Sequence, residues 1–255
     1  ACSKLGNIYQ AQGDQEKALE YYQEYHRLSE VLHQAHPEQM QFKNNLAIAC
    51  QNLGIIYKAQ GKLEQALKYY QEYHRLEEEL HQDHPKQVQF KNLLAISCQC
   101  LGIIYRDQGN QEQALEYFQE YHRLKKELYQ ANPEQVAFKN GLAIASQYLG
   151  SIYKAQGKQE QALEYYQELH RLEEELHQTY PEQVAFKNGL AVALGFLGEF
   201  YRDQHKDKKQ ARAYLQRCYE LRKELAEDFP GYKEFQVRYA WVQETLAGLD
   251  DLEKE

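Results

Sequence analysis

The chain has 255 residues, with 38 Asp or Glu against 30 Lys or Arg, and its formal net charge at pH 7 is −8. A nucleic-acid backbone partner requires clustered Lys and Arg that displace counterions, so this acidic balance argues against nucleic acid as a partner. The sequence has no run of about 18 apolar residues, which argues against a membrane span and a membrane partner.

The five cysteines form an odd set without CxxC spacing. Such usage is typical of a reducing compartment, and we therefore expect a cytoplasmic protein. Cys2, Cys50 and Cys98 recur at one phase of the pattern described next, where a small buried residue fits. Buried thiols are usually inert, so we expect a packing role for them.

The sequence repeats with a period of 48 residues. The string LG-x-x-Y begins at Leu5, Leu53, Leu101 and Leu149, and the variant LGEFY begins at Leu197. Residues 53–100 and 101–148 agree at 31 of 48 positions. Self-similarity at a fixed period predicts a repeat architecture in which each unit is one supersecondary module.

Proline and glycine mark the boundaries within each unit. The five prolines, one per unit, are Pro37, Pro85, Pro133, Pro181 and Pro230. Because proline fixes φ and lacks an N–H, we expect each to stand at the start of a helix. A second break falls four residues after each motif Tyr, at Gly13, Gly61, Gly109 and Gly157. Each unit is therefore predicted to hold two helices, roughly 85–108 and 110–130 in the third unit.

In chain order, these signals predict a single array over residues 1–255 with about eleven helices. A partial first unit covers 1–36, further units start near 37, 85, 133 and 181, and a C-terminal capping helix covers 230–255. Ala1 falls inside a helix, so we expect an upstream piece of a longer protein to be missing. One residue is inserted in the turn over 205–209, and the charged end of the last helix suits a cap.

Apolar periodicity favours helices over strands. In the third unit, at about 100° per residue, the apolar residues of the first helix fall within an arc of about 80°. They are Phe90, Leu94, Cys98, Leu101 and Tyr105. The second helix has a similar stripe, made of Ala114, Phe118, Tyr121 and Leu128. One helix pair cannot bury both stripes alone, so neighbouring pairs must stack.

The motif residues resemble the tetratricopeptide repeat signature, in which L-G-x-x-Y is followed by Gly, Ala and an aromatic residue. The matching sets are Leu53, Gly54, Tyr57, Gly61, Ala66 and Tyr70; Leu101, Gly102, Tyr105, Gly109, Ala114 and Phe118; and Leu149, Gly150, Tyr153, Gly157, Ala162 and Tyr166. The unit departs from the family's usual 34 residues in having longer helices. The resemblance implies an all-α fold, a right-handed α-solenoid of stacked antiparallel helix pairs, that binds protein or peptide partners.

No catalytic constellation is apparent, and we expect a protein that is not an enzyme and has no cofactor. The acids are spread over helix surfaces, and we expect the run Glu77–Glu79 to be a solvated face. His26, His74, His122 and His170 recur once per unit, but helices packed about 8–10 Å apart cannot bring such a row to one metal ion. We therefore expect helix-edge packing for these histidines and no metal site.

Three rows of polar residues lie on the first helices opposite the apolar stripe. They are Asn44, Asn92, Asn140 and Asn188; Gln51, Gln99 and Gln147; and Lys58, Arg106, Lys154 and Arg202. In tetratricopeptide folds the first helices line the concave wall, so the resemblance assigns these rows to a ligand groove. The carboxamides can exchange hydrogen bonds with a peptide backbone, and the cations favour an acidic ligand or a free C-terminal carboxylate. Alternatively, the Asn row is idle after duplication, or bonds to a neighbouring helix.

Two functions remain open from the sequence. The first is a protein–protein interaction scaffold that binds a peptide or protein segment in its concave groove. The second is a sensor or regulatory repeat domain of a larger multidomain signalling protein, whose upstream effector is missing from this fragment. The full-length sequence would distinguish them, whereas the ligand's identity and the oligomeric state do not follow from the residues.

Overall fold

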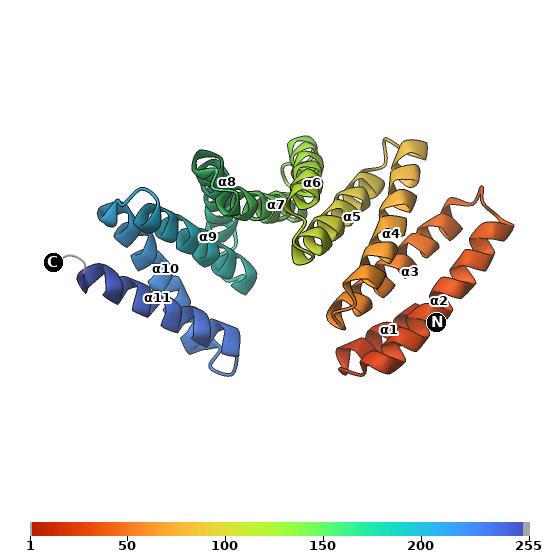
Figure 1. The fold of residues 1–255 in the computed structure, drawn as a ribbon, viewed down its shortest axis with the longest axis horizontal. Helices are drawn as coiled ribbons and strands as arrows, with labels where there is room; N and C mark the ends of the chain where they lie inside the picture. The colour runs from red at the N-terminus through yellow and green to blue at the C-terminus, as the bar shows by residue number, and fades with distance from the viewer. Residues whose placement is uncertain (1, 252–255) are drawn as a thin grey trace. The chain divides into compact units, whose positions relative to one another are not determined.

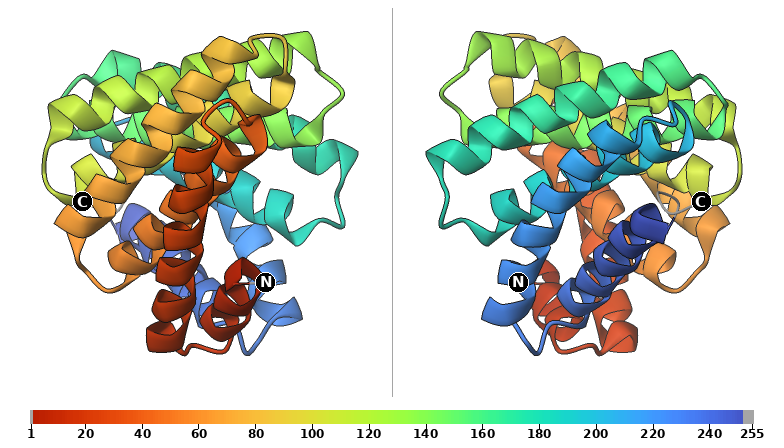
Figure 2. Two further views of the ribbon diagram at one scale, coloured as in Figure 1. Left: turned by 90° about the vertical axis from the view of Figure 1, so that its right-hand side faces the viewer. Right: turned by 90° about the vertical axis from the view of Figure 1, so that its left-hand side faces the viewer.

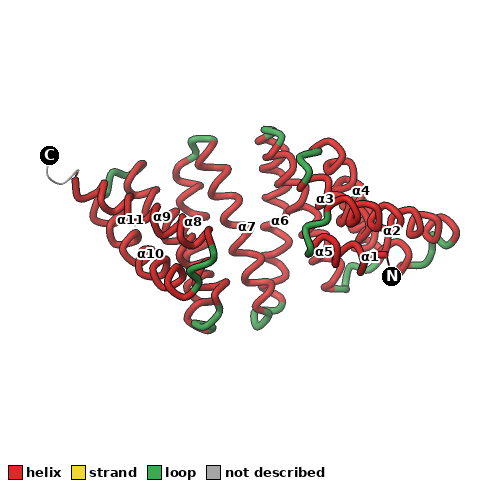
Figure 3. The backbone as a smooth tube through the Cα atoms, turned by 90° about the horizontal axis from the view of Figure 1, so that it is seen from below, coloured by secondary structure: helices red, strands yellow, loops and turns green. Residues whose placement is uncertain are grey.

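The computed structural model describes residues 2–251, which are helices joined by short turns and contain no strand (Figures 1 and 3). The predicted eleven helices are confirmed within this range. They are α1 (Cys2–Ala11), α2 (Gln15–Ala35), α3 (Met40–Ala59), α4 (Leu63–Asp83), α5 (Val88–Asp107), α6 (Gln111–Ala131), α7 (Val136–Ala155), α8 (Gln159–Thr179), α9 (Val184–Asp203), α10 (Lys208–Asp228) and α11 (Lys233–Asp251). The predicted end of the capping helix, residues 252–255, lies outside the described residues.

The helices group into two compact units, residues 1–128 and 129–255, with the boundary inside α6. Within each unit, consecutive helices run antiparallel and pack side by side, as α1 with α2 and α10 with α11 show (Figures 1 and 2). Odd-numbered helices are the first helices of the repeat, and even-numbered helices are the second. The all-α solenoid of stacked antiparallel pairs is thereby confirmed, whereas the extent of a single array over 1–255 stays a prediction.

Each proline lies in the turn before a helix, three residues ahead of the first helical residue. We had expected each proline to stand at the start of the helix itself. In the third unit the Gln87 N–H donates to the His84 carbonyl at 3.0 Å, and α5 begins only at Val88. Pro85 is therefore the second residue of a four-residue turn, a position that its fixed φ suits. The proline still marks a boundary between two helices, as predicted.

The glycine after the motif Tyr closes the first helix of four pairs in the left-handed conformation. Gly109 has a φ of 81°, and the N–H of Asn110 reaches back to the Tyr105 carbonyl at 2.8 Å. This geometry is the usual glycine C-cap. In the last pair the predicted insertion changes the turn, because Lys206 takes the positive φ of 55° and the Asp207 N–H bonds to the Tyr201 carbonyl.

The predicted core stripes are buried. Leu101 is 0% exposed, as are Cys98 and Ala114. The motif glycine lets the second helix approach, since a Cβ on Gly102 would lie 2.5 Å from the Phe118 ring. The same close approach recurs in neighbouring pairs, and it explains why the signature couples a glycine to an aromatic or aliphatic side chain sixteen or seventeen residues later.

The motif tyrosines stack on tyrosines of the second helices. The ring centroids of Tyr57 and Tyr69 are 5.6 Å apart, and those of Tyr105 and Tyr117 are also 5.6 Å apart. The Tyr57 hydroxyl also accepts a hydrogen bond from the Gln23 carboxamide of the preceding pair at 3.1 Å. Much of the tyrosine content thus serves packing within and between pairs.

Helix α5 (Val88–Asp107) is, among the residues described, the one helix long and apolar enough to cross a membrane, with a mean hydropathy of 1.2 over 18 residues. Half of that window is buried inside the protein. A core helix in a stack of helices meets the same criteria. The absence of a membrane partner stays a prediction.

Candidate binding surface

The three predicted rows lie on α3, α5, α7 and α9, and all eleven of their residues are half-buried. The physical reason is that a first helix packs between two second helices, as α3 does between α2 and α4. The arc opposite the apolar stripe is therefore partly covered.

Two residues of the Asn row are engaged by the second helix of their own pair. The Asn92 Oδ1 accepts from Lys125 Nζ at 2.6 Å, and the Asn188 Oδ1 accepts from Arg222 Nη1 at 2.5 Å. These two residues follow the alternative of bonding to a neighbouring helix. Asn44 Oδ1 is buried without a partner among the described residues. Ligand binding by the row stays a prediction.

The second-helix position that faces the Asn row carries a buried charged residue in four successive pairs: Glu77, Lys125, Glu173 and Arg222. Glu77 was expected on a solvated face, but it is 0% exposed, and both of its carboxylate oxygens lack partners. Burial raises the pKa of Glu77 to about 8 and that of Glu173 to about 7. It lowers the pKa of Lys125 to about 8. In each case removal from water disfavours the charged form.

A lysine just before each Asn ties the two helices of its pair together. Lys91 Nζ is 2.8 Å from Glu127 Oε2, and Lys139 Nζ is 2.9 Å from Glu175 Oε2. Lys43 and Lys187 make the corresponding contacts in their own pairs. The recurrent F-K-N segment is thus a polar contact between paired helices.

The Gln row is the least engaged of the three. Within residues 2–251, the side chains of Gln51, Gln99 and Gln147 make no hydrogen bond to the protein. Their carboxamides keep one acceptor and two donor hydrogens for solvent or a ligand.

The cationic row is already paired with acids. Lys58 Nζ lies 3.4 Å from Asp107 Oδ2, and Lys154 Nζ lies 3.4 Å from Glu199 Oε2 on the next first helix. Arg106 and Arg202 pair with the aspartates that follow them in sequence. The row is therefore a line of ion pairs, and its positive charge is largely compensated.

A pocket of about 360 Å³ opens on the first helices of the C-terminal unit. It brings together Gln147 and Asn188, one from each of two predicted rows, with residues of α9, α10 and α11. The lining residues that sequence reasoning missed include Phe196, Glu199, Arg222, Glu234, Arg238 and Trp241. Trp241 is the one tryptophan of the chain, and this was the feature of the sequence that could have indicated α11 as part of the site.

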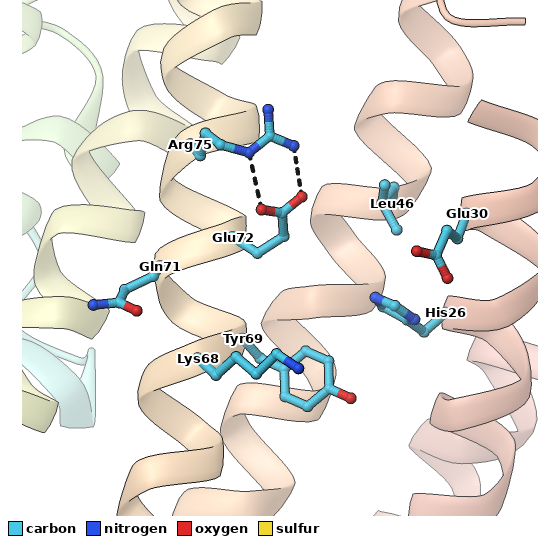
Figure 4. A pocket seen from close by; sticks show the side chains of 8 residues that line it. All are labelled: His26, Glu30, Leu46, Lys68, Tyr69, Gln71, Glu72 and Arg75. Carbon is cyan, nitrogen blue, oxygen red and sulfur yellow. Dashed lines mark hydrogen bonds and ion pairs between the residues drawn. The ribbon is translucent and has the colours of Figure 1, made fainter. Parts of the chain in front are cut away.

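A second pocket, of about 590 Å³, lies in the N-terminal unit and is lined by residues of the second helices α2 and α4 and by Leu46 of α3 (Figure 4). Arg75 forms two hydrogen bonds to Glu72, three residues earlier on α4, at 2.9 and 2.6 Å. The His26 ring stands edge-on to the Tyr69 ring at 5.5 Å. Of the charged groups of this pocket, Arg75 and Glu72 are thus satisfied by one another.

Histidine and cysteine side chains do not converge in the part of the chain that the structure describes, where no three His, Cys, Asp or Glu residues could hold a metal ion. His74 and His170 contact tyrosine rings of the next second helix edge-on. Burial raises the pKa of Cys50 and of Cys98 to about 12, so both thiols are protonated at neutral pH. These contacts agree with packing roles.

Solved structures share the fold at low sequence identity. The crystal structure of BtubC (BKLC) from P. vanneervenii matches with a TM-score of 0.60 and 16% identity, over 94% of this chain and 92% of that one. The apo form of RapI matches with a TM-score of 0.59 and 14% identity, over 100% of this chain and 84% of that one. MamA matches with a TM-score of 0.51 and 17% identity, over 88% of this chain and 97% of that one. These likenesses support the solenoid fold.

Sequence comparison with curated proteins gives no match to this chain. Three family models described as tetratricopeptide repeat do match, over residues 1–35 and 49–81, residues 94–134, and residues 145–172. The matched segments together cover more than half of the chain, and each contains the LG-x-x-Y motif or its Gly–Ala–aromatic continuation. The chain therefore belongs to the tetratricopeptide repeat family, whose members typically act as protein-interaction scaffolds.

Proposed function

We propose that the protein binds an extended peptide segment of a partner protein on its first-helix face, with the C-terminal unit's pocket as the main anchor. The observation that carries this proposal is the position of that pocket. It opens on α7, α9 and α11, and Gln147 and Asn188 of the predicted rows line it. Family membership makes a protein partner the first expectation, and the five free cysteines favour a cytoplasmic location.

The Gln row supports recognition of a peptide backbone. A carboxamide without an internal partner can accept from a peptide N–H and donate to a peptide carbonyl. Gln51 and Gln99 repeat in the N-terminal unit at the position that Gln147 holds in the pocket. An extended segment could therefore meet the same group at successive repeats of one unit.

An acidic ligand is compatible with the cationic row. The side chains of Lys58 and Lys154 remain about one-third exposed, and their contacts with Asp107 and Glu199 are long, at 3.4 Å. A ligand carboxylate could approach the same ammonium groups and share them with the resident acids. Part of the acidic preference would then be lost at high salt, as expected for partly exposed charges.

The test is a selection from a library of displayed peptides, followed by affinity measurement with purified variants. Gln147→Ala removes a carboxamide that has no partner in the protein, so folding should change by no more than about 0.5 kcal/mol. Binding should weaken by about 1–3 kcal/mol if the side chain bonds to a buried peptide group. Gln161→Ala, on the exposed surface of α8, is the matched control.

Equal affinity of Gln147→Ala and Gln161→Ala for every selected peptide would refute the first-helix face as the binding surface. Loss of binding in Gln161→Ala alone would move the site to the second helices. Circular dichroism of both variants shows whether the fold is retained.

A further inference from the structure

We propose that the pocket between α9 and α11 binds one carboxylate flanked by an apolar or aromatic side chain, with Arg222 as the buried anion-binding group. The inference rests on the proposed function and specifies its ligand. The carboxylate could come from the C-terminus of the partner or from an Asp or Glu side chain within it. Both sources present the same planar oxyanion.

The Arg222 guanidinium is buried and forms no ion pair with the described residues. It is 3% exposed, its Nη1 donates to the neutral Asn188 carboxamide, and its Nε has no partner. Of the residues described, none places a carboxylate oxygen within 4 Å of it, and Glu234 favours its charged form only from beyond that distance. An isolated buried charge is unfavourable, and the usual partner of a guanidinium is a carboxylate that accepts two parallel hydrogen bonds. The described part of the protein provides no carboxylate within hydrogen-bond distance of Arg222, and Arg222 lines a pocket that a ligand carboxylate could enter.

A second cation, Arg238, lines the same pocket from α11. It is exposed and makes no ion pair with the described part of the chain. Burial lowers the pKa of Arg222, and like-charge repulsion from Arg238 lowers it further. A bound carboxylate would relieve this repulsion, because it would be attracted by both guanidinium groups.

The acids that line the pocket limit how much negative charge it accepts. Glu199 is already paired with Lys154 at 3.4 Å. Glu234, in the first turn of α11, is exposed and has no ion-pair partner among the described residues. Its charge acts on Arg222, so it would weakly repel one carboxylate bound beside Arg222 and would repel a run of acidic residues more strongly. The pocket is therefore suited to one carboxylate and not to a polyacidic segment.

The apolar part of the pocket fits one side chain. The Trp241 ring packs over Gly195, where a Cβ would lie 3.4 Å from the ring. Phe196 stacks on Tyr166 with ring centroids 4.9 Å apart, which holds its ring in place. Two aromatic rings and a volume of about 360 Å³ suit an aromatic or large aliphatic side chain beside the carboxylate.

Trp241 provides a direct assay, because it is the one tryptophan of the chain and lines the pocket. Its fluorescence is titrated with four synthetic peptides. The first pair is acetyl-Ala-Ala-Ala-Phe with a free C-terminus and the same peptide amidated. The second pair, both amidated, is acetyl-Ala-Glu-Ala-Phe and acetyl-Ala-Gln-Ala-Phe. The first pair tests a terminal carboxylate and the second pair tests a side-chain carboxylate.

At least one acidic peptide should bind about tenfold more tightly than its neutral match, as expected for a charge-assisted hydrogen bond to a desolvated guanidinium. Arg222→Met should abolish this preference while affinity for the neutral peptide is retained. Arg238→Gln, an exposed substitution that should not affect folding, should reduce the preference severalfold, and Glu234→Gln should increase it. Arg217→Gln, on the outer surface of α10, should leave it unchanged.

Equal affinity for acidic and neutral peptides would overturn the inference and leave the proposed peptide function intact. A tenfold preference that survives in both Arg222→Met and Arg238→Gln would also overturn it. If no peptide changes Trp241 fluorescence while library-selected peptides bind elsewhere, the pocket is not the anchor and both proposals about it fail.

Discussion

We expect Glu77→Gln to stabilise the protein by an amount that grows with pH. The wild-type carboxyl is 0% exposed and lacks hydrogen-bond partners, and burial raises its pKa from 4.5 to about 8. Between these values the unfolded chain releases the proton while the folded chain retains it. Folding therefore takes up a proton, and the free energy of unfolding falls as pH rises from about 4.5 to about 8.

The magnitude follows from about 1.36 kcal/mol per pKa unit. The carboxyl should destabilise the fold by about 1 kcal/mol at pH 5, about 3 kcal/mol at pH 7, and about 5 kcal/mol above pH 8. Glutamine has nearly the same shape and no charge, so Glu77→Gln should remove this penalty. By repeat register, its amide also faces Asn44, whose Oδ1 lacks a donor, as Lys125 faces Asn92.

The assay is urea unfolding followed by circular dichroism at pH 5, 7 and 9. The difference between variant and wild type should be small at pH 5 and largest at pH 9. Glu78→Gln, at the exposed neighbouring position, is the matched control and should stay within about 0.5 kcal/mol of wild type at each pH. A variant that is less stable than wild type at pH 9, or that keeps the wild-type pH dependence, would refute the inference that the Glu77 carboxyl is buried and protonated in the folded protein.

Three further substitutions test the packing. Leu101→Ala, at a 0% exposed core position, should lower the free energy of unfolding by about 2–5 kcal/mol in urea titrations. Gly102→Ala should destabilise by about 1–2 kcal/mol, because overpacking against the Phe118 ring outweighs the gain in helix propensity. Gly248→Ala, where a Cβ meets nothing within 4 Å, should instead raise the melting temperature.

Much of the fold was predictable because its signals are local. Proline and glycine at fixed phase mark where helices stop, and the buried stripe of Leu101 and its neighbours follows from the 3.6-residue period. These signals require only the backbone preferences of single residues and the spacing of apolar ones. The helix number and the helix pairing followed from them.

The candidate site depended on contacts that the sequence does not encode locally. Helical periodicity identified which face lies opposite the core stripe, but a first helix in a stack has two neighbours, so that face is half-buried. Asn92 and Lys125 lie 33 residues apart, and no local rule pairs them. Only the tertiary structure decided that this register buries a charge in successive pairs, and that Arg222 and Trp241 meet in one pocket.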